Sequence, residues 1–421
     1  MRPAIAFKST LFAGALLLAA VLIAGCGSGG GSGSSDSTTA LPATIGQGAG
    51  GASKCGLGNG KAASGEPIPV GAIAEMSGGP GVAQGTAAAG AYFDCVNANG
   101  GIGGRPIKFL TFDSAYNPQK AAQGAEKLIH DDNVVAFAGG ASFLDCLVNG
   151  QIYEEEDVYS ISGIAGPPEC NGNSHLAAVD NGKTDWIGAA KYAIDNLGAK
   201  KLAIVVAKAG TIAEAVIETD TAYAEEHGAE VVKAIKIDPG LTDATSVVLD
   251  IAAAKPEAVI VASLQQDALT VLKAAQAQGL TESPKWVCLA LCYSSNLPEL
   301  LGSAWDGLAI ETPFPLVDSK GADITLFNQV MAKYASGEPL DPFSQGGFLA
   351  AQIFTNALLG MKGPINRQTV GPVLAGIKDY KTEMLCTPWS FGTESVTAVR
   401  YIQLSDGGFE EAAGCTPVLG G

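Results

Sequence analysis

Residues that could do catalytic chemistry are few in this chain. The three histidines, His130, His175 and His227, have no serine elbow or HExxH pattern around them. His227 precedes Gly228 at the end of a predicted helix, where the helix dipole stabilises a cation, so a structural role is favoured. The acidic run 154–157 is typical of a solvated helix terminus. Walker A and GxSxG motifs are both missing, so we expect neither an enzyme nor a cofactor.

A glycine-rich loop at residues 77–81 is the first candidate for a binding site. It follows a short apolar run and precedes a helix that the pattern predicts over 84–97. Glycines at 100–104 stop that helix, and a second apolar run follows. This order is typical of a parallel βαβ unit. Since ligands bind beyond the carboxyl ends of strands in open α/β sheets, we expect Ser77 and Gly78 to contact a ligand.

The same alternation of apolar runs and amphipathic helices continues along the chain in two series. The first series ends near residue 161, and the second begins at Lys183. Short apolar runs between such helices indicate parallel sheets that are covered on both faces. A chain of 421 residues is also too long for one small core. We therefore expect an α/β protein with two doubly wound, Rossmann-like lobes.

The first 25 residues have the features of a bacterial lipoprotein signal peptide. A basic start precedes an apolar run at 11–23 that is too short to span a bilayer. The sequence Ile-Ala-Gly-Cys at 23–26 resembles a lipobox, in which the cysteine is lipidated. An ordinary signal peptide with an incidental cysteine is the alternative. We expect Cys26 to anchor the protein to the extracytoplasmic face of the cell membrane, and the Gly/Ser-rich residues 26–65 to form a flexible tether.

The protein is strongly acidic. Its formal net charge of −17 becomes −19 when Arg2 and Lys8 leave with the signal peptide. Nucleic-acid binding requires clustered Lys and Arg, so a nucleic-acid partner is not expected. The commonest meaning of such a charge is solubility.

Eight of the nine cysteines remain when Cys26 is set aside, in a compartment that favours disulfides. Spacing suggests the pairs Cys288 with Cys292, Cys146 with Cys170, Cys386 with Cys415, and Cys55 with Cys95. Zinc is the alternative. No histidine lies at ligand spacing from a cysteine pair except His175, five residues after Cys170, so we expect no metal.

Six short segments together resemble one known family. They are VGAIAEMSG at 70–78, NANGGIGG at 97–104, DSAYNP at 113–118, IYEEE at 152–156, AAQAQGL at 274–280 and WDG at 305–307. The family is the leucine/isoleucine/valine-binding type of periplasmic solute-binding protein, which serves ABC importers. The resemblance implies a type I periplasmic binding fold, whose two lobes are joined by three crossovers and close on a small solute. The lobes expected are 66–180 with 315–395, and 181–314 with 396–421.

The resemblance also implies site residues. In amino-acid-binding members, the loop after the third strand offers a serine hydroxyl and N–H groups at a helix N-terminus to the substrate carboxylate. Ser142 and Phe143 hold that place here. Ala165 and Gly166 stand where the next loop usually supplies a threonine for the α-amino group. Ala290 stands where an acidic residue usually pairs with the ammonium.

Further positions come from the second lobe. Thr211 stands where the family usually has an aromatic residue in the cleft wall of the second lobe. Ala83 stands at a corresponding aromatic position in the first lobe. Gln265 and Gln266 follow a predicted strand and are the expected polar contributors. An ammonium group buried without a carboxylate would cost several kcal/mol, so an ordinary α-amino acid is a doubtful ligand. We expect a small or aromatic carboxylic acid, an amide or an atypical amino acid.

The resulting hypothesis is a monomeric solute-binding protein that delivers a small molecule to an ABC transporter permease. The nearest alternative is the same fold as a ligand-sensing subunit of a signalling receptor. An exported hydrolase would require a nucleophile and a base in the interlobe cleft. A purely structural surface lipoprotein would have a filled cleft and no hinge motion.

Overall fold

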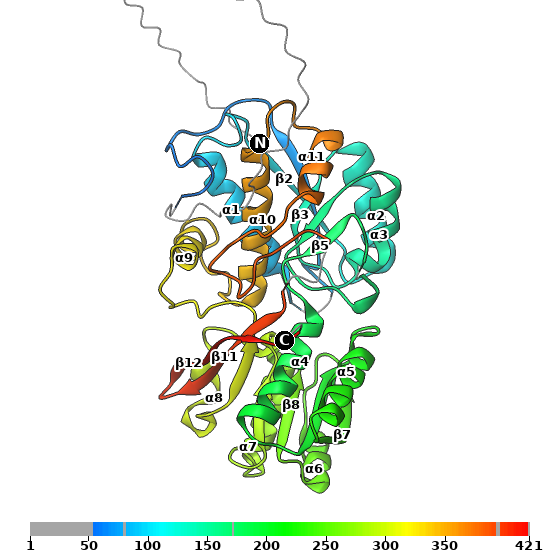
Figure 1. Ribbon diagram of the computed structural model, residues 1–421, viewed down its shortest axis with the longest axis vertical. Coiled ribbons are helices and arrows are strands. Elements are labelled where there is room, and N and C mark those ends of the chain that lie inside the picture. Colours follow the sequence, from blue (N-terminus) through cyan, green and yellow to red (C-terminus); the bar gives the residue numbers. More distant parts are fainter. Residues whose placement is uncertain (1–53, 79–80, 171, 393–395, 420–421) are drawn as a thin grey trace, which may run out of the picture. The chain divides into compact units, whose positions relative to one another are not determined.

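Five parallel strands form the first sheet, in the order β2-β1-β3-β4-β5. They are β1 (Ile68–Ala74), β2 (Ile107–Asp113), β3 (Phe137–Gly140), β4 (Ser160–Ser162) and β5 (Leu176–Ala178). Alternate residues of β1 face opposite sides, so Val70 and Ile73 belong to different hydrophobic clusters. One face is covered by α1 (Ala83–Ala98) and α10 (Pro342–Leu359), which lie side by side in Figure 1. The other is covered by α2 (Pro118–Glu126) and α3 (Asp145–Glu155).

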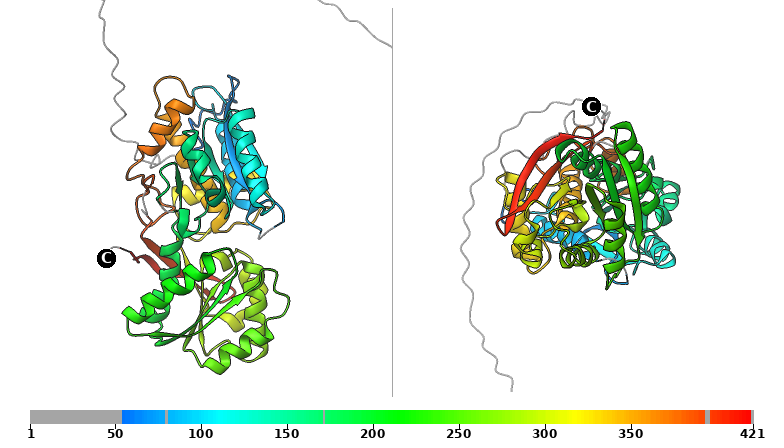
Figure 2. Two further views of the ribbon diagram at one scale, coloured as in Figure 1. Left: turned by 90° about the vertical axis from the view of Figure 1, so that its right-hand side faces the viewer. Right: turned by 90° about the horizontal axis from the view of Figure 1, so that it is seen from below.

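The second sheet has seven strands, in the order β12-β11-β10-β9-β8-β6-β7. Its parallel strands are β6 (Lys201–Ala207), β7 (Glu230–Ile237), β8 (Ala258–Ala262), β9 (Lys285–Cys288) and β10 (Ala309–Thr312). The antiparallel strands β11 (Ala398–Ser405) and β12 (Gly408–Pro417) extend it beyond β10 (Figure 2). Ile204 of β6 packs towards α4 (Gly182–Lys191) and α5 (Ile212–Glu226), and Val205 packs towards α6 (Thr245–Ala254) and α7 (Gln265–Ala277).

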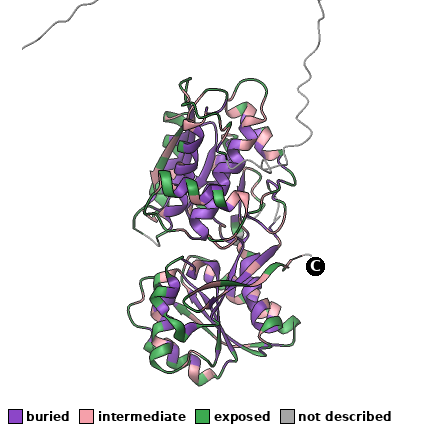
Figure 3. Ribbon diagram, turned by 90° about the vertical axis from the view of Figure 1, so that its left-hand side faces the viewer, coloured by how far each residue is buried: buried purple, intermediate pink, exposed green. Residues whose placement is uncertain are grey.

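The two sheets share one winding pattern. The order β7-β6-β8-β9-β10 repeats the order β2-β1-β3-β4-β5 of the first sheet. Figure 3 shows the buried strands of both sheets between helices whose outer faces are exposed. The sheets therefore form two doubly wound α/β lobes, as the alternation of the sequence predicted.

The chain passes between the lobes three times. It leaves the first sheet after β5 and enters α4, which packs on the second sheet. It returns after β10 to α9 (Ala322–Tyr334), α10 and α11 (Arg367–Ala375), and goes back at β11. We call the first sheet with α1–α3 and α9–α11 lobe 1, and the second sheet with α4–α8 lobe 2; α8 spans Leu297–Leu301.

The computed structural model describes residues 54–78, 81–170, 172–392 and 396–419. The expected signal peptide, Cys26 and residues 27–53 lie outside this part of the chain. None of the helices described is both long and apolar enough to cross a membrane.

The last part of the expected tether is packed onto lobe 1, which corrects the prediction for residues 54–65. Cys55 is buried and disulfide-bonded to Cys95 of α1. The Ala63 N–H group donates to the Asn97 carbonyl at 2.8 Å. A covalent bond and backbone hydrogen bonds thus hold a segment whose composition alone indicated a flexible chain.

Three disulfides are present, joining Cys55 to Cys95, Cys146 to Cys170 and Cys386 to Cys415. The fourth expected pair is wrong, because Cys288 and Cys292 are both free and buried. The Cys292 thiol faces the carbonyl oxygens of Val261 and Ser263, each 3.6 Å away. Burial raises the pKa of the Cys288 thiol well above its usual range, so this thiol stays protonated.

The sequence patterns missed several short elements, among them β5, β10, α8 and α11. β5 has only three residues, and β10 places the acidic residue Glu311 in a fully buried strand that runs into a proline-rich segment. Neither of these two strands has both the length and the apolar run that identified the other strands.

Candidate functional site

Each lobe has a switch point where neighbouring strands are followed by connections that leave in opposite directions. These points lie between β1 and β3 in lobe 1, and between β6 and β8 in lobe 2. Ligands of doubly wound sheets bind at the carboxyl ends of such strands. A cavity of about 790 Å³, which we call the cleft, is lined by the loops after all four strands. Its lining includes Gly78 after β1, Phe143 after β3, Ala209 after β6 and Leu264 after β8.

The cleft walls are mainly apolar and aromatic. The ring centroids of Phe143 and Phe343 are 6.5 Å apart in an edge-to-face arrangement. Trp186 of α4 reaches the same cavity. The other large apolar and aromatic side chains of the lining are Tyr116, Val206, Ile212, Val216, Leu264, Leu289, Leu291 and Tyr293. Such walls suit a ligand with a substantial apolar body.

Charged side chains of the cleft are already engaged. Asp341 Oδ1 accepts the Ser344 N–H group at 2.9 Å and caps α10, while its Oδ2 accepts Gln84 Nε2 at 2.7 Å. Burial raises the pKa of Asp341 to about 6. Among the described residues that line the cleft, Lys208 is the single cation, and its Nζ lies 2.8 Å from Asp238 Oδ1.

A second acid, Asp267, lies on the lobe 2 side of the cleft. Its Oδ1 accepts the N–H groups of Gly240 at 3.0 Å and Leu241 at 2.8 Å. The carboxylate therefore fixes the loop after β7. Asp267 is thus held by backbone N–H groups, and Lys208 by an ion pair.

The N-terminus of α3 carries a carboxyl group of the chain itself. Glu75 Oε1 accepts hydrogen bonds from Ser142 Oγ at 2.8 Å and from the Leu144 N–H group at 3.2 Å. Ser142 Oγ in turn accepts the Asp145 N–H group at 3.1 Å and caps the helix. Glu75 is buried, and desolvation raises its pKa to about 7. The donors that we expected to hold a ligand carboxylate are therefore occupied by Glu75.

Five of the eight expected ligand-binding residues line cavities at this edge of the sheets. Gly78, Phe143 and Gln265 line the cleft. Gln265 Nε2 also donates to Asn296 Oδ1 at 3.1 Å. Ala165 and Gly166 line a smaller neighbouring cavity.

The other three residues do not line the cleft. Ser142 is bound to Glu75, as described above. Ser77 Oγ donates to Asp113 Oδ2 at 2.5 Å, and Thr211 Oγ1 donates to Glu169 Oε2 at 3.0 Å. The Ser77 and Ser142 hydroxyls bind acids of lobe 1, whereas the Thr211 hydroxyl of lobe 2 reaches across to Glu169 of lobe 1. A contact of these three residues with a ligand stays a prediction.

The smaller cavity, which we call the side pocket, has a volume of about 70 Å³. It shares Phe143, Trp186 and Phe343 with the cleft, so the two cavities adjoin at these rings. Ala290 lines the side pocket, as does Asp185 in the first turn of α4.

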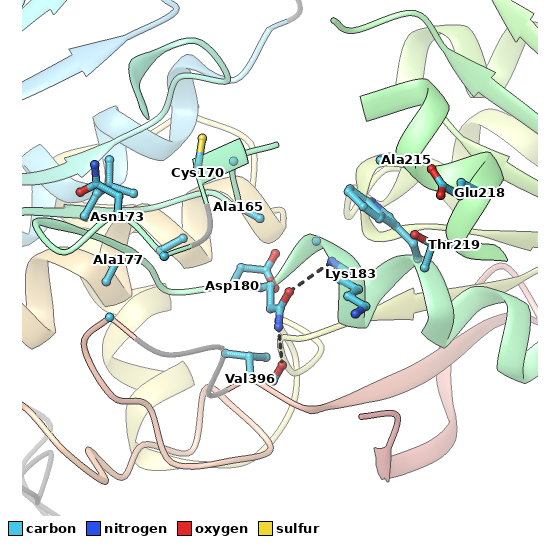
Figure 4. A pocket seen from close by; sticks show the side chains of 18 residues that line it. Ala165, Cys170, Asn173, Ala177, Asp180, Lys183, Ala215, Glu218, Thr219 and Val396 are labelled. Carbon is cyan, nitrogen blue, oxygen red and sulfur yellow. Dashed lines mark hydrogen bonds between the residues drawn. The ribbon is translucent and has the colours of Figure 1, made fainter. Parts of the chain in front are cut away.

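A third cavity of about 560 Å³ lies beside the crossover that follows β5 (Figure 4). Asp180 and Lys183 of this crossover line it together with Glu218 of α5. The Asn181 side chain accepts the Lys183 N–H group at 3.2 Å and donates to the Val396 carbonyl at 3.3 Å. None of the four switch-point loops lines this cavity, so we take the cleft as the candidate site.

Comparison with known proteins agrees with this architecture. A model of the periplasmic binding protein family matches residues 67–406, well over half of the chain. The chain belongs to the periplasmic binding protein family. The resemblance to leucine/isoleucine/valine-binding proteins is thereby confirmed for family and for the type I periplasmic binding fold.

Individual relatives are distant. An amino acid binding protein of Pseudomonas aeruginosa is 27% identical over 190 residues, which is 44% of this chain and 50% of that protein. This match thus spans half of the relative's length. A leucine binding protein, LivK, of Thermotoga maritima has a TM-score of 0.71 and 16% identity, covering 83% of this chain and 99% of the other.

A second solved structure belongs to a solute binding protein of an ABC transporter from R. palustris, in complex with 4-hydroxybenzoate. Its TM-score is 0.69 at 20% identity, over 84% of this chain and 98% of the other. At these identities, the two solved structures show the fold alone.

Sequence reasoning missed several residues of this binding protein's site. Trp186 and Asp341 lie outside the glycine-rich loops that the sequence pattern singles out. Asp341 had a usable signal, because Asp-Pro-Phe-Ser at 341–344 is the pattern of a capped helix start. Glu75 had none, since its partner Ser142 is distant in the sequence.

Proposed function

We propose that this periplasmic binding protein captures a small, largely apolar solute in the cleft and delivers it to an ABC importer. Cys26 would anchor it to the extracytoplasmic face of the membrane. The observation that carries the proposal is the cavity of about 790 Å³ at the switch points of both lobes. Each methylene group buried there contributes about 0.8 kcal/mol to binding.

The identity of the solute is constrained by the polar groups. Ala290 supplies no carboxylate where an α-amino acid would place its ammonium. Glu75 occupies Ser142 and the N–H group of Leu144, where a ligand carboxylate would bind. An ordinary α-amino acid would therefore meet neither of its two usual partners. Of the ligand classes expected from the sequence, an amide or another molecule without a carboxylate fits best.

Relatives support the transport role. The structural neighbours include a leucine binding protein and a solute binding protein of an ABC transporter. The three crossovers between the lobes give the chain the hinge on which such proteins close, and a ligand that contacts both lobes favours the closed state. We propose that the protein acts as a monomer.

The hydrolase alternative requires a nucleophile and a base together in the cleft. Ser263 contributes a hydroxyl group to the cleft lining. Among the described residues, no histidine or cysteine lines the cleft. The sensor alternative uses the same site. A permease gene beside this one would favour import, and a receptor gene there would favour sensing.

A thermal-shift panel tests the proposal, because a ligand that binds only the folded state raises the melting temperature. The probes are 3-phenylpropanamide, 2-phenylethanol, 3-phenylpropanoate, 4-hydroxybenzoate and leucine. We expect the amide or the alcohol to raise the melting temperature, and Phe143→Ala to reduce the effect. Leu249→Ala, which alters an exposed leucine of α6, is the control. A panel without any response would contradict the proposal.

A further inference from the structure

Two glutamine side chains line the cleft from opposite lobes. Gln84 is the second residue of α1 in lobe 1, and Gln265 is the first residue of α7 in lobe 2. A glutamine amide has a donor end, Nε2, and an acceptor end, Oε1. The partners of one end therefore determine what the other end offers to a solute.

The donor end of Gln84 is held by lobe 1. Its Nε2 donates to Asp341 Oδ2 at 2.7 Å and to the Gly81 carbonyl at 3.3 Å. Burial raises the pKa of Asp341 to about 6, so this carboxyl group is mostly ionised at neutral pH and only accepts. Because both partners are acceptors, the amide cannot turn over without losing both bonds. The orientation of Gln84 is thus fixed.

Lobe 2 fixes Gln265 in the same way. Its Nε2 donates to Ser294 Oγ and, at 3.1 Å, to Asn296 Oδ1. The Ser294 hydroxyl donates its own hydrogen to Asn296 Oδ1, so it accepts from Gln265. Both partners lie in the connection between β9 and α8. They leave the Oε1 end of Gln265 as the free end.

The acceptor ends of both amides remain free. Within the described residues, no group donates to Gln84 Oε1 or to Gln265 Oε1. Neither oxygen is enclosed by the protein, unlike Oε1 of Gln345, which also lacks a donor but is buried. Each lobe therefore offers one oriented acceptor to a solute in the cleft.

Side chains of the cleft that can only donate are directed elsewhere. Lys208 is paired with Asp238. The indole edge of Trp186 that carries the N–H group lies against Gly182, where a Cβ atom would be 3.4 Å from Trp186 Cε2, and Gly182 does not line the cleft. Hydroxyl groups of the lining, such as that of Tyr116, donate or accept and suit either kind of solute.

We propose that Gln84 and Gln265 recognise the polar group of the solute as a hydrogen-bond donor. Their Oε1 atoms accept N–H or O–H groups of the solute from both lobes, which favours the closed state. The solute is then a neutral molecule with an apolar body and at least one such donor, as in a primary amide. This assignment rests on the proposed function, because it places the contacts in the same cleft.

Calorimetric titration of two nearly isosteric probes tests the assignment. In 4-phenylbutan-2-one, a methyl group replaces the NH₂ group of 3-phenylpropanamide. We expect the amide to bind more tightly by about 10-fold or more. Burial of apolar surface alone would favour the ketone, because its methyl group is the more apolar. A second pair, 2-phenylethanol and its methyl ether, should show the same preference for the donor.

Variants of the two glutamines locate the preference. Gln265→Met and Gln84→Met should each lower the affinity for the amide by about 3-fold to 10-fold and leave that for the ketone unchanged, since a thioether is a weak acceptor. Gln265→Glu keeps an acceptor oxygen and should keep the preference, which a merely structural role would not predict. If Gln84→Met does not fold because Asp341 loses a donor, Gln265→Met decides.

The matched control is Gln151→Met. Gln151 is an exposed glutamine of α3 whose Nε2 also donates to a carboxylate, Glu155 Oε1, at 2.6 Å. It lines none of the described cavities. Its replacement should change neither affinity.

The outcomes separate this assignment from the proposed function. If the ketone binds as tightly as the amide, or if the preference persists in Gln265→Met, the assignment is overturned while the cleft remains the binding site. Loss of the preference in Gln265→Glu as well would also overturn it. If neither probe binds while an acid of the thermal-shift panel does, the assignment fails. If no member of the panel binds, the proposed function fails with it.

Discussion

Glu75 Oε1 lies 2.8 Å from Ser142 Oγ, at the N-terminus of the helix where a ligand carboxylate was expected. The chain thus supplies its own carboxyl group to that anion site. Since Glu75 occupies these donors, we expect it to disfavour ligands that carry a carboxylate.

Removing this side chain should create an anion site. In Glu75→Ala, Ser142 Oγ and the Leu144 N–H group lose their acceptor. We expect the affinity for 3-phenylpropanoate to rise by about 10-fold or more, which corresponds to at least about 1.4 kcal/mol. Glu75→Gln is the control, because its amide still occupies the place. Equal affinities of the two variants, measured by calorimetry, would contradict the account.

Glu75 should also shape the dependence of stability on pH. Its pKa is raised from 4.5 to about 7, so the folded state holds the proton to a higher pH than the unfolded state does. The free energy of unfolding therefore falls as the pH rises through this window, by about 3 kcal/mol from this group.

Glu75→Gln removes this contribution, so its stability relative to the wild type should rise by about 3 kcal/mol between pH 4 and pH 8. Urea denaturation at a series of pH values measures the difference. Other buried acids, such as Asp341, contribute equally to both proteins and cancel. Parallel stability curves for the two proteins would show that Glu75 is not the group responsible.

The aromatic walls should carry much of the affinity. Phe143→Ala or Phe343→Ala removes ring surface from the cleft. Each should lower the affinity for an aromatic probe by about 10-fold to 100-fold, or about 1.5–3 kcal/mol. Leu249→Ala on α6 is the control and should leave binding unchanged. Undiminished affinity in both phenylalanine variants would mean that the probe binds elsewhere.

The disulfide between Cys146 and Cys170 should stabilise lobe 1. It closes a loop with a sequence separation of 24 residues. Replacing both cysteines by serine should lower the free energy of unfolding by about 3 kcal/mol. Peptide mapping without reduction should find Cys288 and Cys292 as free thiols, reactive only after unfolding. A disulfide-linked peptide that contains either of them would contradict the structure.

Periodicity allowed most of the fold to be predicted. The order of strands and helices in both lobes follows the predicted alternation, because most strands are apolar runs set between amphipathic helices. β5 escaped because three residues carry too little signal. The composition of residues 54–65 indicated a flexible tether. That prediction was wrong for this segment, because local composition does not reveal the disulfide from Cys55 to the distant Cys95.

The sequence predicted which loops line the cleft, but not which of their side chains are free to contact a ligand. Phe143 and Gln265 line the cleft because they follow strands that end at a switch point. Ser142 and Thr211 also follow such strands, but their hydroxyls bind Glu75 and Glu169. These hydrogen-bond partners come from other parts of the chain, so the sequence alone gave no basis for choosing between a ligand and an internal acceptor.

Trp186 offers the most direct test that solute binds in the cleft. It lines the cleft, whereas Trp286, Trp305 and Trp389 are buried and line none of the described cavities. Tryptophan emission should be recorded during titration with a probe that raises the melting temperature. The account predicts a saturable change in emission that is lost in Trp186→Phe while the rise in melting temperature persists. A rise in melting temperature with unchanged emission would place the ligand outside the cleft and contradict the account.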